Sequence, residues 1–165
     1  MIREGCVEDL PDIMGLIQEA IIDMESKGIY QWDNSYPNKE IISGDIDGRN
    51  LYVYENDGVI QGIIVLNEEQ DEAYKNIQWE FNTGSQLVIH RVCIAPQYQG
   101  KGIAKVLMGF AQQKGKESGY EAIRLDTFEN NDSACNLYKK LGYIDVGTVR
   151  FSKGKFYCFE KPLNY

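Results

Sequence analysis

A glycine-containing turn between an apolar strand and a helix carries the clearest chemical signal in this sequence. Residues 87–94 are mostly apolar or β-branched, Pro96 cannot continue a strand, and apolar residues recur at helical spacing from Ile103 onwards. The first turn of a helix has backbone N–H groups without intrahelical partners, and Gly100 and Gly102 allow a ligand to approach that backbone closely. Because such helix ends attract anions, the sequence predicts a phosphate-binding turn.

The spacing within this turn narrows the kind of phosphate that it would bind. The pattern is Gln99-x-x-Gly102-x-Ala104, and Lys101 is followed by glycine rather than by the serine or threonine of a Walker loop. The three spaced glycines of a dinucleotide fingerprint are absent as well. The pattern therefore disfavours an unrelated nucleotide-binding α/β domain, and a tight connection without a ligand stays as the alternative.

A second segment with a distinctive spacing follows about 30 residues later, at residues 131–143. Its periodicity predicts a short amphipathic helix that Asp132 caps and Gly142 ends. The apolar face of this helix is expected to contain Ala134, Leu137, Tyr138 and Leu141. The face places Tyr138 inward, whatever its role.

Together, the two segments resemble the signatures of the GCN5-related N-acetyltransferase (GNAT) superfamily. The first resembles the acyl-CoA signature of Gln or Arg, two residues, Gly, one residue and Gly or Ala, with Pro96 at its usual place. The second resembles Asn-x-x-Ala-x-x-Leu-Tyr-x-x-x-Gly-Phe, with Tyr143 replacing Phe. The resemblance implies a mixed α/β fold with a mostly antiparallel central sheet, a splayed parallel pair of strands and about four helices. It also implies acetyl-CoA as co-substrate.

The resemblance assigns roles to individual residues. In relatives the pantetheine arm pairs with the strand backbone, and the pyrophosphate binds N–H groups at the helix start. The matching positions are Val92, Cys93 and Ile94 for the first, and Gln99, Gly100, Lys101, Gly102, Ile103, Ala104 and Lys105 for the second. Asn131 matches an asparagine that contacts the cofactor, and Tyr138 matches the tyrosine that donates a proton to the departing CoA thiolate. The alternative role of Tyr138 is core packing.

The implied reaction is direct transfer of an acetyl group from acetyl-CoA to a primary amine, without a covalent enzyme intermediate. Cys93 lies in an apolar strand without a base nearby in the sequence, so we expect a structural thiol rather than a nucleophile. The alternative function is a non-catalytic acyl-CoA-binding or sensing module. The intact Tyr138 argues against that alternative.

Three residues are candidates for the base that takes a proton from the amine, and proton loss through water is the alternative. Asp126 lies five residues before Asn131, where some relatives carry a glutamate base. His90 is of the residue type that ionises near neutral pH, but strand alternation groups it with inward-facing neighbours, which favours a hydrogen-bonded core histidine. Glu80 lies between two aromatic residues and is either enclosed by them or an exposed strand residue.

Two segments rich in aromatic residues lie outside the cofactor motifs. We call residues 28–37 the first aromatic segment and residues 72–84 the second aromatic segment. In the superfamily the corresponding segments tend to vary with the substrate, and aromatic side chains with an acid can receive an amine. The candidate acceptor-binding residues are Tyr30, Trp32, Asp33 and Trp79. The alternative is that these aromatic side chains only fix their loops.

Composition bounds the remaining function classes. The net charge is −8, from 25 acidic and 17 basic residues, so we expect neither nucleic acid nor an anionic membrane as a partner. One histidine and four cysteines without a close pair predict no metal site. Without a membrane-spanning apolar run or a secretory signal pattern, we expect a cytoplasmic protein. The acceptor, a small-molecule or peptide amine, and the oligomeric state, a homodimer included, stay open.

The order of predicted elements indicates a single domain over residues 1–165 with a mixed α/β sheet. Asn56-Asp57-Gly58 is a strong hairpin signal. The expected elements are strands at 2–5, 51–54, 59–66, 87–94 and 122–128, helices at about 10–24, 38–46 and 103–118, the short helix after Asn131, and a final hairpin that turns at Lys153-Gly154.

Overall fold

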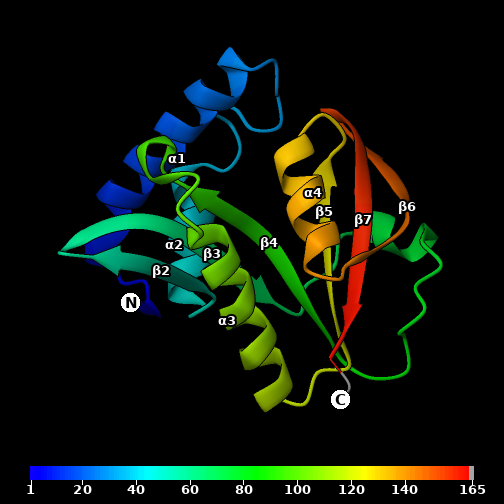
Figure 1. The fold of residues 1–165 in the computed structure, drawn as a ribbon. Coiled ribbons are helices and arrows are strands. Elements are labelled where there is room, and N and C mark those ends of the chain that lie inside the picture. Colours follow the sequence, from blue (N-terminus) through cyan, green and yellow to red (C-terminus); the bar gives the residue numbers. More distant parts are fainter. Residues whose placement is uncertain (164–165) are drawn as a thin grey trace. The chain divides into compact units, whose positions relative to one another are not determined.

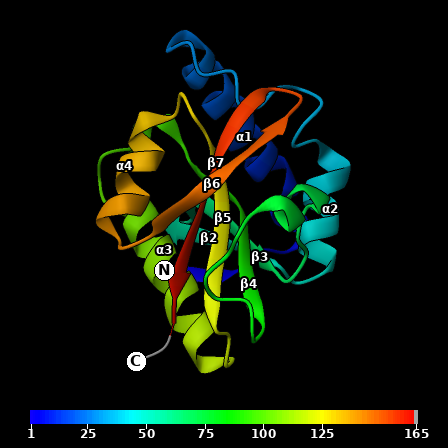
Figure 2. The same cartoon turned by 90° about the vertical axis from the view of Figure 1, so that its right-hand side faces the viewer.

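The computed structural model describes residues 1–163, and Figures 1 and 2 show its ribbon from two sides. These residues form two compact units. The first unit consists of residues 1–66 and 91–109, and the second of residues 67–90 and the described residues from 110 onwards. Strand β4 (Gln86–Ile94) and helix α3 (Ile103–Glu117) contribute residues to both units. The expectation of one domain over residues 1–165 stays a prediction.

The strands of the first unit follow the order β1-β2-β3-β4. Strands β1 (Ile2–Glu4), β2 (Leu51–Asn56) and β3 (Val59–Asn67) are antiparallel neighbours. The predicted β2–β3 hairpin is confirmed, and its turn has Asp57 at φ 52° and Gly58 at φ 78°. Two positive φ values match the twist of a two-residue hairpin, which explains why an Asp-Gly pair stands there.

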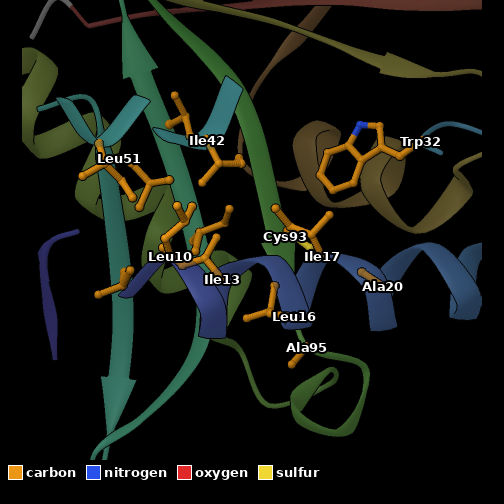
Figure 3. Close-up of a cluster of buried hydrophobic side chains, with 14 of the residues drawn as sticks. Leu10, Ile13, Leu16, Ile17, Ala20, Trp32, Ile42, Leu51, Cys93 and Ala95 are labelled. Carbon is orange, nitrogen blue, oxygen red and sulfur yellow. The ribbon is translucent and has the colours of Figure 1, made fainter. Parts of the chain in front are cut away.

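Helices α1 (Leu10–Ser26) and α2 (Lys39–Asp47) build the core of the first unit with these strands. In Figure 3 the side chains of Leu10, Ile13 and Ile17 on α1 gather with those of Leu51 and Cys93. The apolar stripe predicted from helical spacing is therefore the buried face of α1.

The strands of the second unit follow the order β4-β5-β7-β6. Strand β5 (Ala122–Phe128) pairs in parallel with β4 over Gln86–Val88, and antiparallel with β7 (Gly154–Pro162). The β7 strand also pairs antiparallel with β6 (Ile144–Phe151), so the predicted final hairpin is confirmed. The sheet is mixed and mostly antiparallel with one parallel pair, as expected.

Helix α4 (Asp132–Lys140) starts differently from the expectation. Its N-cap is Asn131, whose Oδ1 accepts a hydrogen bond from the backbone N of Ala134 at 3.2 Å, and not Asp132. Asparagine and aspartate are both good caps, so the sequence alone did not decide between the neighbours. The side chain expected to contact the cofactor therefore also fixes the start of the helix that carries Tyr138.

Cys93, Cys135 and Cys158 are buried, whereas Cys6 is exposed. Within residues 1–163, no group of three or more metal-ligating side chains comes together. None of the helices in this part of the chain combines the length and the apolar character needed to cross a membrane.

Candidate functional site

The glycine-containing turn of the first unit begins where β4 ends. Residues Pro96–Tyr98 form a short 3₁₀ turn, and α3 starts at Ile103. Gly100 and Gly102 between them have φ values of 77° and 82°, which residues with a Cβ rarely adopt. Among the described atoms, none lies within 4 Å of the position that a Cβ would take at either glycine. Conformation rather than packing therefore requires these glycines, and the space beside the backbone is open.

Side chains hold the turn in place. Gln99 Nε2 donates a hydrogen bond to the carbonyl oxygen of Ile94 at 3.3 Å, which ties the turn to the end of β4. The ammonium group of Lys101 lies 5.5 Å from the centroid of the Tyr98 ring. The signature glutamine thus has a local structural task, which is to fix the turn relative to the strand.

The start of α3 presents backbone donors next to positive charge. Its ladder begins with a hydrogen bond from Val106 N to Gly102 O at 3.1 Å, so the N–H groups of residues 103–105 have no partner within the helix. Lys101 and Lys105 are exposed on either side of this start. Backbone donors and lysines at one helix N-terminus are suited to a phosphate anion.

The last residues of β4 lie against a glycine of β3. A Cβ at Gly62 would come within 2.8 Å of Ile94 Cδ1 and 3.2 Å of the Cys93 carbonyl oxygen. Gly62 therefore permits the close approach of the strand expected to bind pantetheine. Sequence reasoning missed it, although a glycine inside an apolar strand signals such an approach. Burial raises the pKa of the Cys93 thiol to about 12, which keeps it protonated and fits a structural role.

In the second unit, Tyr138 is buried on α4, as the helical face predicted. Its ring centroid lies 6.0 Å from that of Tyr143 and 5.9 Å from that of Phe159. Burial, followed by the negative charge of Asp126, raises the pKa of Tyr138 above its ordinary value. The phenol is therefore protonated at neutral pH, as a proton donor must be.

Asp126 lies on β5, where it interacts electrostatically with Tyr138. Burial raises the pKa of Asp126 from 3.8 to about 6, and a hydrogen bond from the Tyr74 hydroxyl to its Oδ2 opposes this rise. The two oxygens of that hydrogen bond are 2.6 Å apart. A carboxyl group with such a pKa is mostly ionised at neutral pH yet basic enough to take up a proton. Sequence reasoning missed Tyr74, because the two residues are 52 positions apart.

The other two candidate bases have different surroundings. His90 is half-buried, so it is not the fully buried core residue that was expected, but its Nε2 does make a hydrogen bond, to Asn67 Oδ1 at 2.5 Å. Glu80 is exposed and lies on a bend, so it is neither enclosed by its aromatic neighbours nor part of a strand. Its backbone N donates a hydrogen bond to Glu160 Oε1 at 2.7 Å, which shows that this position fixes the local chain.

The four candidate acceptor-binding residues fall into two groups. Trp32 belongs to the core of the first unit, and Trp79 is buried in the second. Tyr30 is 56% exposed, and Asp33 Oδ1 accepts hydrogen bonds from the backbone N and Oγ of Ser35. The two tryptophans are thus buried packing residues, while Tyr30 is exposed and Asp33 is half-buried.

The sequence matches a family model described as "Acetyltransferase (GNAT) family" over residues 17–143. Among curated relatives, an uncharacterized N-acetyltransferase of Bacillus subtilis is 21% identical over 158 residues, which cover 94% of this chain and 86% of the relative. An uncharacterized N-acetyltransferase of Lactobacillus delbrueckii subsp. lactis is 28% identical over 161 residues, covering 90% of this chain and 84% of the relative.

Solved structures give the same result for the fold. A crystal structure assigned to an acetyltransferase from Staphylococcus aureus Mu50 is 34% identical, with a TM-score of 0.80 and coverage of 99% of both chains. A GNAT-family acetyltransferase from Streptococcus agalactiae is 27% identical, with a TM-score of 0.83 and coverage of 98% of this chain and 94% of that one. The acyltransferase fold expected from the two signatures is confirmed.

Proposed function

Because the chain belongs to the GNAT acetyltransferase family, we propose that it transfers the acetyl group of acetyl-CoA directly to a primary amine of a small molecule or peptide. The observation that carries this proposal is the pair formed by Tyr138 and Asp126. Burial keeps the phenol protonated and leaves the carboxyl group with a pKa of about 6. One group is therefore suited to give a proton and the other to take one at the same pH.

The residues assigned to cofactor binding have different tasks in this reaction. In the first unit, the backbone of Val92, Cys93 and Ile94 binds the pantetheine arm, and residues 99–105 bind the phosphates. The strand N–H groups also stabilise the oxyanion that forms at the thioester carbonyl. In the second unit, Asn131 contacts the cofactor from the cap of α4.

Proton transfer is the task of the second unit. Asp126 takes a proton from the incoming ammonium, so that the neutral amine forms the new C–N bond. Tyr138 donates its proton to the sulfur as the C–S bond breaks, and it regains a proton from the acetylated nitrogen through solvent. The products are the acetylated amine, CoA with a free thiol, and one proton released to solvent.

The proposal also covers the acceptor, the localisation and the partners of the protein. A net charge of −8 favours cationic amines as acceptors over anionic ones. Tyr30 and Asp33 would contact the acceptor directly, whereas the buried Trp32 and Trp79 would shape the surrounding loops. We place this single-domain enzyme in the cytoplasm and assign it no nucleic-acid, membrane or metal partner.

Replacing Tyr138 by phenylalanine tests the proposal. We expect kcat for amine acetylation to fall by about 10²-fold or more, because the departing thiolate loses its proton donor. Acetyl-CoA should still raise the Tm of the variant, since the residues assigned to cofactor binding are unchanged. Thiol release measures the first effect and thermal unfolding the second. Equal turnover in both proteins would overturn the role of Tyr138.

Tyr143 offers a matched control for this experiment. Its hydroxyl is buried and has no hydrogen-bond partner among residues 1–163, and the family pattern has phenylalanine at this position. Tyr143→Phe therefore removes an equivalent hydroxyl from a neighbouring ring and should leave turnover unchanged. Acetyl-CoA binding by the wild type without turnover of any amine in a screen would instead favour the sensing module.

A further inference from the structure

Tyr74 connects the second aromatic segment to the base of the proposed reaction. It lies in the 3₁₀ turn Glu72–Asn76, which Asp71 caps by accepting a hydrogen bond from Ala73 N. Tyr74 is only 3% exposed, and its hydroxyl donates to Asp126 Oδ2. This hydrogen bond fixes the orientation of the carboxylate that would receive the proton.

Trp79 fixes Tyr74 in turn. The indole Nε1 donates a hydrogen bond to the backbone oxygen of Tyr74 at 2.9 Å, and the centroids of the two rings are 5.1 Å apart. Both side chains are buried, so neither can change rotamer without disturbing its neighbour. The phenol is thus presented to the carboxylate in one orientation.

Two buried charges hold the part of the segment that follows Trp79. The Arg124 guanidinium stacks 4.3 Å from the Trp79 ring centroid and donates from Nη2 to the Phe81 backbone oxygen at 2.9 Å. The Glu160 carboxylate accepts the backbone N–H of Glu80 at 2.7 Å. Arg124 therefore holds the segment at the Phe81 carbonyl, and Glu160 holds it at the Glu80 amide.

Burying the charges of Arg124 and Glu160 costs free energy, so their presence in the interior calls for an explanation. Arg124 is 6% exposed and Glu160 is fully buried, and they occupy facing positions on β5 and β7. Apolar residues of similar size are often as stabilising as buried charges. Apolar side chains could not bind the polar backbone of the second aromatic segment, and this binding is what the charges achieve.

We propose that Tyr74 is a positioning residue for the base Asp126, and that Arg124 and Glu160 hold the segment that presents it. This inference rests on the proposed function and adds a residue to it. The segment expected to vary with the acceptor thereby becomes part of the proton-transfer machinery. Its sequence affects catalysis as well as specificity.

The pKa of Asp126 depends on burial and on four neighbouring groups. Tyr74 donates to the carboxylate from the second aromatic segment and favours the charged form, while the negative charge of Asp71 opposes it. Tyr138 on α4 and Cys158, its partner on β7, also interact with the carboxyl charge. Tyr74 is the hydrogen-bond donor in this group, so its loss should make the carboxylate harder to form.

The test is a titration of the Asp126 carboxyl carbon by ¹³C NMR in the wild type and in Tyr74→Phe. We expect the pKa of Asp126 to rise by about one pH unit, because a hydrogen bond to a charged group is lost. The acidic limb of the kcat/KM profile should move upward by the same amount, while KM for acetyl-CoA stays unchanged. A merely structural role would not move both midpoints together.

Two variants accompany this measurement. Tyr157→Phe removes a phenol hydroxyl from β7 that is not bound to Asp126, and should leave both midpoints in place. Trp79→Phe removes the indole hydrogen bond that fixes Tyr74, and should move both midpoints upward by a smaller amount. It provides the same test if Tyr74→Phe does not fold.

The outcomes separate the inference from the function on which it rests. An unchanged pKa of Asp126 in both variants overturns the role of Tyr74, whatever the turnover. A raised pKa with an unmoved activity profile also overturns it, because Asp126 is then not the base, while acetyl transfer itself stands. Absence of turnover in the wild type with every amine tested defeats the proposed function, and the NMR titration still reports on the contact.

Discussion

The two aromatic segments are fixed by buried charges in different ways. Near the first segment, Arg91 and Asp45 bind each other: Arg91 Nη2 lies 2.7 and 2.6 Å from the two carboxylate oxygens. The segment itself joins this ion pair through Tyr36, whose hydroxyl accepts a hydrogen bond from Arg91 Nη1 at 2.8 Å. The first aromatic segment is thus connected through the Tyr36 side chain to two charges that bind each other.

In the second segment the charges bind the chain directly. Glu160 accepts the amides of Glu80 and Phe81, and Arg124 donates to the Phe81 carbonyl. Charges that satisfy each other mainly stabilise a unit, whereas charges that bind backbone groups also determine where a segment lies. Removing a charge should therefore cost more stability in the first unit and displace the segment more in the second.

Breaking the ion pair should give the largest effect on stability. Asp45→Asn leaves the Arg91 guanidinium, only 7% exposed, without its counter-charge. We expect a loss of about 3–5 kcal/mol in the free energy of unfolding, the usual cost of an uncompensated buried charge. Urea denaturation measures it. A loss below about 1 kcal/mol would show that the pair is not effectively desolvated.

Two further variants sharpen this result. Asp47→Asn removes an exposed carboxylate from the same helix and should stay within about 0.5 kcal/mol of the wild type. The double variant Asp45→Leu with Arg91→Met replaces the pair by apolar side chains and should recover most of the lost stability. Failure to recover would mean that the hydrogen bond to Tyr36 matters more than the pair itself.

Glu160→Gln should have a smaller effect on stability and a larger one on the segment. Glutamine keeps a carbonyl acceptor but loses the charge that receives two backbone amides, so we expect a loss of about 2 kcal/mol. Because the chain has two tryptophans, the indole N–H signals report on both segments. In Glu160→Gln the Trp79 signal should shift and the Trp32 signal should stay, and Asp45→Asn should do the reverse.

A matched control for this prediction lies within the second segment. Glu72 is exposed and pairs with Lys75 at the surface, so Glu72→Gln should leave both indole signals and the stability unchanged. Equal shifts of both indole signals in Glu160→Gln would contradict the distinction between the two segments.

Local chemistry made most of the fold predictable. The β2–β3 hairpin follows from Asp57 and Gly58, and the helices follow from their apolar periodicity and end signals. The same periodicity placed Tyr138 in the interior before any contact was known. Such features depend on residues that are neighbours in the sequence, which is why they could be predicted without an alignment.

The rest of the candidate site depends on contacts between distant residues. Strand alternation gives each residue a face but does not say that a charged side chain on that face is buried, so Arg124 and Glu160 were not predicted. The hydrogen bond between Tyr74 and Asp126 joins a loop to a strand, and no local pattern encodes it. Asn131 shows the same limit at short range, because two adjacent residues were equally good caps.

Tyr36→Phe should give the smallest effect, and its pH dependence completes the comparison. Tyr36 is 42% exposed and loses one hydrogen bond, so we expect a cost of about 1 kcal/mol. This cost should be equal at pH 5 and pH 8, because arginine stays charged throughout.

Asp126 behaves differently: its pKa is raised from 3.8 to about 6, so the folded state loses stability as pH rises through that range. Without the hydroxyl of Tyr74 the ionised carboxylate is less stable still, so the deficit of Tyr74→Phe should be larger at pH 8 than at pH 5. Denaturation of both variants at the two pH values measures these losses of stability. A loss in Tyr74→Phe that does not depend on pH would show that Tyr74 does not favour the ionised form of Asp126.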